Sequence, residues 1–255
     1  ALYYKGDCEY RAGQDDAALA DLEQVIQRGA DQFMENALVG ASDILFKQER
    51  WEGALDRFTA LESHASTPQN TLVAQLGQMR CLKELGRDEE AARAAEKVAA
   101  NTNATNDMKA DAGIAIGNGL LAKDDLDGAF AKFKSVANAS RNVFGAEAKY
   151  RCAYVKHLQK KYRDAEKEVF ALVDKFPSYD HWKAKSFILL GDVYLQLDDR
   201  FQAKATLQSV IDHCTEPELV AEAQHRLDAI NASTIQQLAP TPQDSLEITL
   251  PGNGQ

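Results

Sequence analysis

The chain repeats one stretch of sequence at a distance that is a multiple of a shorter period. Residues 6–26 read GDCEYRAGQDDAALADLEQVI and residues 191–211 read GDVYLQLDDRFQAKATLQSVI, with seven identical positions. Six alanines mark one repeat each, at spacings of 36 to 38 residues: Ala18, Ala54, Ala91, Ala129, Ala165 and Ala203. A unit of this size cannot bury an apolar face alone, so we expect each unit to stack on its neighbours.

Each unit has the apolar spacing of two short amphipathic helices. Apolar residues recur three and four positions apart between Gly6 and Ser233, without the alternation of a strand. The residues four and seven positions after every marker are apolar, as Leu22 and Val25 are in the first unit. Twelve positions before the marker the residue is small in five of the six units, and Met79 is the exception. We therefore predict an all-α chain whose paired helices approach closely at the small residue.

This pattern resembles the tetratricopeptide repeat family, whose unit is a helix-turn-helix of about 34 residues with a small residue in the first helix and an alanine in the second. The resemblance spans about nine tenths of the chain, although the period is longer and tryptophan is scarce in the first helices. It implies a solenoid of about six repeats with a C-terminal capping helix. Residues 176–211 also resemble bacterial cell-envelope members of the family, such as the TolA-binding protein of the Tol-Pal system. That finer resemblance implies a periplasmic or cell-envelope location.

We expect the solenoid to occupy residues 1–232 and residues 233–255 to form an extended or disordered tail, because the tail has three prolines, two glycines and no Lys or Arg. The apolar stripe of the capping helix is Leu219, Ala223, Leu227 and Ile230. At the other end, Leu2, Tyr3 and Tyr4 lie in a first helix that no preceding unit covers. We expect this surface to contact another molecule or preceding repeats, unless the tyrosines fold back over their own repeat.

The charge and the motifs argue against several functional classes. A formal net charge of -10 and a pI near 5.0 argue against a nucleic-acid surface. The chain has no nucleophile motif, phosphate-binding loop or HExxH sequence, so we predict neither enzymatic activity nor a cofactor. His213, Cys214 and His225 lack metal-ligand spacing, so we predict no metal site. No apolar run is long enough to cross a membrane, and the four cysteines are too far apart in a solenoid to form disulfides.

The resemblance implies that the first helix of each unit lines a concave groove, and the helical period identifies which residues share that face. The candidate groove residues lie eleven or eight positions before the markers: Asp7, Tyr10, Asp43, Phe46, Arg80, Lys83, Asn118, Tyr154, His157 and Asp192. The register could differ by one position in units one and five, because Glu9 and Lys156 stand where the other units have an apolar residue.

Aromatic side chains flanked by carboxylates predict a groove for a peptide or protein segment with apolar and basic residues. The alternative is a solvated inner face without a ligand. The groove lacks the Lys and Asn set by which some family members hold a C-terminal carboxylate. We therefore expect a non-catalytic protein-protein interaction scaffold, and the alternative function is a structural spacer within a longer solenoid that positions other domains.

Overall fold

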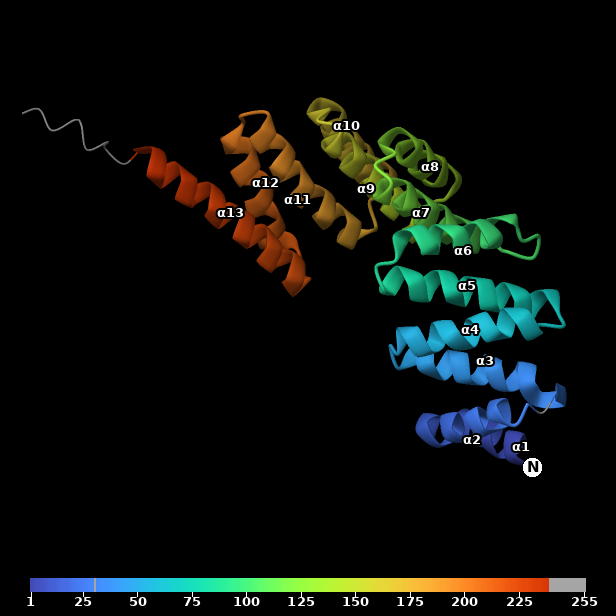
Figure 1. Ribbon diagram of the computed structural model, residues 1–255. Coiled ribbons are helices and arrows are strands. Elements are labelled where there is room, and N and C mark those ends of the chain that lie inside the picture. The colour runs from blue at the N-terminus through green and yellow to red at the C-terminus, as the bar shows by residue number, and fades with distance from the viewer. Residues whose placement is uncertain (30, 239–255) are drawn as a thin grey trace, which may run out of the picture. The chain divides into compact units, whose positions relative to one another are not determined.

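The computed structural model describes residues 1–29 and 31–238, and these residues form thirteen helices and no strand. The helices belong to two compact units, the first spanning Ala1–Tyr179 and the second beginning at Asp180. Figure 1 shows the helices of the first unit following one another in chain order, each pair beside the next. The predicted helical solenoid fold is confirmed.

The helices of the first unit are α1 (Leu2–Arg11), α2 (Asp15–Gln27), α3 (Asp31–Lys47), α4 (Trp51–His64), α5 (Pro68–Glu84), α6 (Asp88–Ala100), α7 (Asn106–Ala122), α8 (Leu126–Ala139), α9 (Val143–Leu158) and α10 (Tyr162–Lys175). The second unit contains α11 (Asp180–Gln196), α12 (Arg200–His213) and α13 (Pro217–Leu238).

The turn inside every helix pair has the same backbone geometry. The residue five positions before each marker has a positive φ in all six repeats: Gly13, Glu49, Gly86, Asp124, Lys160 and Asp198, with φ between 57° and 73°. In the fifth repeat, Lys160 N–H donates to the carbonyl of His157, and Lys161 N–H donates to the carbonyl of Lys156. The equivalent two bonds form in the other five repeats, as in a Schellman C-cap. Glycine occupies this left-handed position in two repeats only, so four turns adopt it with a side chain that disfavours it.

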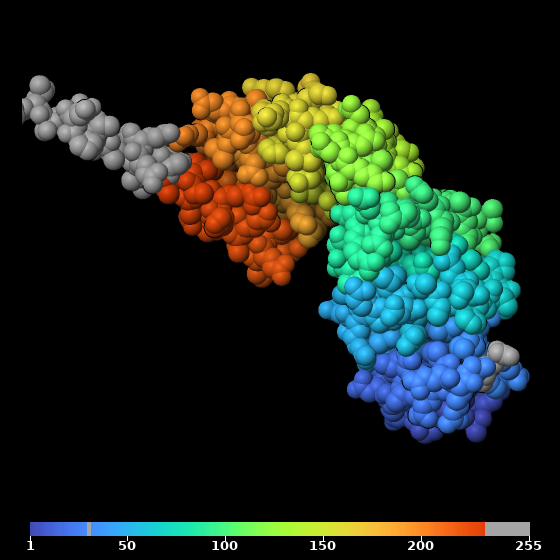
Figure 2. All heavy atoms as spheres, viewed as in Figure 1, coloured from blue at the N-terminus to red at the C-terminus, as the bar shows by residue number. Residues whose placement is uncertain are grey.

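Size complementarity joins the two helices of a pair. A methyl group added at Gly117 on α7 would lie 2.4 Å from a ring carbon of Phe133 on α8, and one added at Gly191 would lie 2.9 Å from Leu207. Met79, the exception in the small-residue row, is fully buried in the same cluster as Ala95, which is the smallest of the residues four positions after the markers. The large and small partners have therefore exchanged places in the third repeat. Figure 2 shows side chains filling the space between successive helices of the first unit.

The second unit ends in the predicted capping helix. Leu219, Ala223, Leu227 and Ile230 of α13 are all buried. The backbone of α13 remains helical to Leu238, whereas the predicted tail begins at residue 233. Residues 239–255 of that predicted tail lie outside the described residues. No helix in the described part of the chain combines the length and apolar character needed to cross a membrane.

Candidate functional site

A hollow of about 410 Å³ lies among α1, α3, α4 and α5, and we call it the first hollow. Four of the predicted groove residues line it, namely Tyr10, Asp43, Phe46 and Arg80. The remaining lining residues are small or apolar: Val39, Gly40, Phe58, Val73, Leu76 and Gly77. The apolar floor and polar rim give this hollow the composition of a site for a large apolar side chain.

Two glycines in the lining of the first hollow let neighbouring side chains pack closely against their helices. A methyl group at Gly40 would lie 2.8 Å from Leu22, and one at Gly77 would lie 2.5 Å from three ring atoms of Phe58. The ring of Phe46 meets Phe58 edge-on at a centroid distance of 6.3 Å. The ring of Phe58 in the floor therefore occupies the volume that a side chain at Gly77 would need, and Leu22 occupies the corresponding volume at Gly40.

The rim of the first hollow carries a cluster of Tyr10, Asp43 and Lys47. The hydroxyl of Tyr10 donates to the carboxylate of Asp43. Lys47 Nζ lies 2.6 Å from Asp43 Oδ2 and donates to Tyr10 Oη at 3.0 Å. The hydrogen bond to Asp43 raises the pKa of Lys47 above its usual range, and burial is the main cause that raises the pKa of Tyr10. The carboxylate of Asp43 is one of the groups from which a basic residue in the ligand is predicted. In the structure this carboxylate is already paired with Lys47 of the same chain.

A buried carboxylate that the sequence analysis missed holds the two basic groove residues of α5. Asp111 on α7 is 3% exposed and accepts hydrogen bonds from Arg80 Nε at 3.2 Å and Lys83 Nζ at 2.6 Å. One negative charge therefore partly neutralises two positive charges. The available signal in the sequence was an acidic residue within an otherwise apolar helix segment, ADAGIAIG.

A second hollow of about 570 Å³ lies among α5, α6, α7 and α9. Three predicted groove residues, Lys83, Asn118 and Tyr154, line it together with Leu121, Glu147, Arg151 and Leu158 among others. Tyr154 stacks on Tyr150 at a centroid distance of 6.4 Å. Asn118 Oδ1 and Arg151 Nε have no hydrogen-bond partner among the described residues. Unpaired polar atoms of this kind are costly and uncommon in folded proteins.

Three predicted groove residues line neither hollow. Asp7 pairs with Arg11 on its own helix at 3.0 Å. His157 faces the ring of Tyr162, and its Nδ1 atom is buried without a partner. Asp192 belongs to the second unit, where both of its carboxylate oxygens accept from Arg226 Nε at 3.1 Å.

In units one and five, where the register could differ by one position, Tyr10 and Tyr154 line the hollows as the predicted register requires. In the fifth unit, Lys156 Nζ instead lies over the ring of Phe130, 3.7 Å from its centroid. In the first unit, Glu9 pairs with Lys5 at 3.2 Å. Both charged residues at the nominally apolar position are therefore accommodated by partners within the chain.

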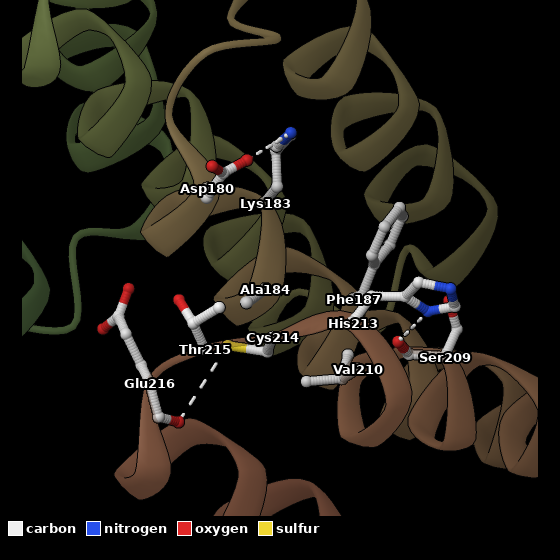
Figure 3. A pocket seen from close by; sticks show the side chains of 10 residues that line it. All are labelled: Asp180, Lys183, Ala184, Phe187, Ser209, Val210, His213, Cys214, Thr215 and Glu216. Carbon is white, nitrogen blue, oxygen red and sulfur yellow. Dashed lines mark hydrogen bonds and ion pairs between the residues drawn. The ribbon is translucent and has the colours of Figure 1, made fainter.

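A third, smaller hollow of about 180 Å³ lies in the second unit, among α11, α12 and the start of α13 (Figure 3). Asp180 and Lys183 form an ion pair of 2.6 Å at one side, and Cys214 Sγ lies 4.0 Å from the carbonyl oxygen of Glu216. His213 Nδ1 lies 2.9 Å from the carbonyl oxygen of Ser209. Across the described residues, no group of three or more His, Cys, Asp or Glu side chains could hold a metal ion, and the four cysteines are free thiols.

The aromatic residues at the start of the chain are half covered. Tyr3 stacks on Phe33 of α3 at a centroid distance of 4.8 Å, so it packs against the first helix of the following repeat. Leu2 is also partly buried, whereas Tyr4 remains 59% exposed.

Comparisons with known proteins agree with this architecture. Two segments, residues 1–28 and 186–214, match the family model for the tetratricopeptide repeat. No curated protein matches the chain. YrrB, a tetratricopeptide repeat protein with an unusual peptide-binding site, is 17% identical with a TM-score of 0.53, over 80% of this chain and 97% of its own.

Two further solved structures cover more of the chain. The apo form of RapI is 14% identical with a TM-score of 0.60, over 92% of this chain and 97% of its own. PilF of Pseudomonas aeruginosa is 14% identical with a TM-score of 0.57, over 88% of this chain and 96% of its own. At these identities the likeness shows the fold. Proteins with this fold generally mediate protein-protein interactions as non-catalytic scaffolds. The chain therefore has the tetratricopeptide repeat fold, and two of its segments match the family model of that repeat.

Proposed function

We propose that this protein is a non-catalytic scaffold that binds an extended segment of a partner protein along the first helices of the repeats in its first unit, α1, α3, α5, α7 and α9, which we call the inner helices. The observation that carries the proposal is the first hollow, where Tyr10, Asp43, Phe46 and Arg80 from three different helices surround an apolar floor. YrrB, which has the same fold, has a peptide-binding site.

The energetics of the first hollow favour an apolar anchor. Burying one leucine- or phenylalanine-sized side chain stabilises a complex by about 1.5–3 kcal/mol. The ring floor is already packed, because Phe58 lies against Gly77 and edge-on to Phe46. Little ordering cost then remains for the protein side of the complex.

Selection of random peptides displayed on phage against the purified chain tests this function. We expect the recovered peptides to carry a large apolar residue, and Phe46→Ala to weaken their binding about tenfold, the loss of about 1.4 kcal/mol. Phe170→Ala, which changes an exposed phenylalanine on α10, the second helix of the fifth repeat, is the matched control and should leave binding unchanged. If the recovered peptides bind both variants with the same affinity as the native chain, the groove proposal is wrong and the spacer function is favoured.

A contact through the start of the chain is a separate proposal. Tyr4 presents an exposed ring next to the stacked pair of Tyr3 and Phe33. Burying this ring against a second copy would make the sedimentation coefficient depend on concentration, and Tyr4→Lys should abolish that dependence. A native chain that sediments as a monomer at all concentrations would exclude self-association through this surface.

A cell-envelope location is also proposed, and it rests on the resemblance of residues 176–211 alone. Fractionation of cells that express the full gene tests it. Recovery of the protein in the cytoplasmic fraction would overturn it.

A further inference from the structure

We infer that the bound segment carries two anchors, an apolar side chain for the first hollow and an amide group for the second hollow, about five or six residues apart. This inference rests on the proposed function and specifies the chemistry of the partner.

The two hollows lie on the same face of the first unit. Helices α1, α3, α5, α7 and α9 contact one another in succession. Asp43 and Arg80 in the first hollow occupy the same repeat position as Asn118 and Tyr154 in the second, eleven residues before the marker. Equivalent positions of a repeat present their side chains to the same side of a solenoid. One extended chain can therefore reach both hollows.

The second hollow is suited to a group that is both a hydrogen-bond donor and an acceptor. The side-chain oxygen of Asn118 has no hydrogen-bond partner among the described residues, so it can accept from a ligand without losing a bond. Arg151 Nε is a donor without a partner among the described residues, and Nη2 of the same guanidinium donates to Glu147 Oε1 at a long distance of 3.4 Å. An amide offers one carbonyl acceptor and one N–H donor to such a pair.

The charges around the second hollow disfavour an ionised ligand group. Lys83 is held by Asp111, and Arg151 lies beside Glu147. Two further carboxylates, Glu84 and Asp88, line the same hollow. A ligand carboxylate would meet these acidic side chains, and a ligand cation would meet the lysine and the arginine. A neutral amide avoids both costs.

The separation of the anchors follows from helix packing. The first hollow is centred between α3 and α5, and the second between α7 and α9, so two inner-helix spacings separate them. Packed helices lie 8–10 Å apart, which places the hollows about 16–20 Å from each other. An extended chain rises about 3.3 Å per residue and spans this distance in about five or six residues.

A series of fluorescein-labelled peptides tests the spacing by fluorescence anisotropy with the full chain. Each peptide carries one leucine and one asparagine in a background of serine and alanine, and their separation varies from about two to about ten residues. We expect the dissociation constant to be lowest at a separation of about five or six, and about tenfold higher at the two extremes. Asn118→Ala should remove the contribution of the amide anchor at every separation, while Asn103→Ala at an exposed loop position should not.

Two peptide variants identify the source of the amide. Replacing the peptide asparagine by alanine weakens binding if its side chain is recognised, and methylating the backbone nitrogens at that site weakens binding if the main chain is recognised. If neither change weakens binding, the amide assignment is wrong. If phage-selected peptides bind through Phe46 but the series shows no optimum, the two-anchor inference is wrong and the proposed function stands. If no peptide binds the inner helices, the proposed function itself fails.

Discussion

Replacing Gly117 by alanine tests whether close approach of paired helices holds each repeat together. The added methyl group would lie 2.4, 2.6 and 2.8 Å from three ring atoms of Phe133, whose side chain is 0% exposed. A fully enclosed ring has no free space to move into, so helices α7 and α8 must separate. The change therefore strains the packing between the two helices of the fourth repeat.

The expected magnitude combines two opposing terms. Overpacking an enclosed site costs about 1–3 kcal/mol. Alanine is about 1 kcal/mol more favourable than glycine inside a helix, which offsets part of that cost. Because all three contacts fall below 3.0 Å, we expect the upper part of the overpacking range and a net loss of about 1–2 kcal/mol in the free energy of unfolding.

Urea unfolding followed by far-ultraviolet circular dichroism measures this loss, and amide hydrogen exchange locates it in α7 and α8. Gly53→Ala is the matched control, because a methyl group there would lie 3.6 Å from Leu45, an ordinary contact distance. We expect that control to raise stability by up to about 1 kcal/mol. Adding Phe133→Leu to Gly117→Ala should recover part of the loss through a coupling of about 1 kcal/mol. A Gly117→Ala chain as stable as the Gly53→Ala chain would refute the reasoning.

Four further predictions concern the turns, the ion pairs and the thiols. Lys160→Gly should raise the unfolding free energy by up to about 1 kcal/mol, because φ is 58° at this turn residue. Asp111→Asn should lower it by about 1–2 kcal/mol, because two cations lose their buried partner. Burial raises the pKa of Glu62, but hydrogen bonds from a lysine and two glutamines lower it by more. Its folded-state pKa therefore lies below the unfolded value of about 4.3. Glu62→Gln should therefore destabilise the chain near about pH 7, and this difference should be lost as the pH falls from the unfolded-state pKa through the lower folded-state pKa. Burial raises the pKa of Cys152 to about 12, so iodoacetamide should alkylate exposed Cys8 much faster in the native chain.

Each of these outcomes has a measurement that can contradict it. Urea titrations would show an error in the turn argument if Lys160→Gly lowered stability, and in the ion-pair argument if Asp111→Asn left it unchanged. A Glu62→Gln effect that is constant with pH would remove the carboxylate from the explanation. Mass spectrometry showing equal alkylation rates for Cys8 and Cys152 would contradict the burial of the second thiol.

The amino-acid sequence by itself determined the repeat and which residues share a helix face. The alanine markers at 36 to 38 residues, the apolar rows after them and the small residues before them define paired helices without reference to any distant contact. Helical periodicity depends only on spacing along the chain, so it also placed Tyr10, Phe46 and Tyr154 on one face. These three residues line the two hollows in the structure.

Only the tertiary structure decided that this face is divided into two hollows and which of its charged side chains are paired within the chain. Asp111 meets Arg80 and Lys83 because α7 packs beside α5, and no local spacing relates residues that are 28 and 31 positions apart. The left-handed turn at Lys160 likewise has no glycine to predict it and follows from how the two helices of the pair must pack. Spacing along a helix fixes which residues share a face, whereas the packing of one helix against another fixes what that face meets.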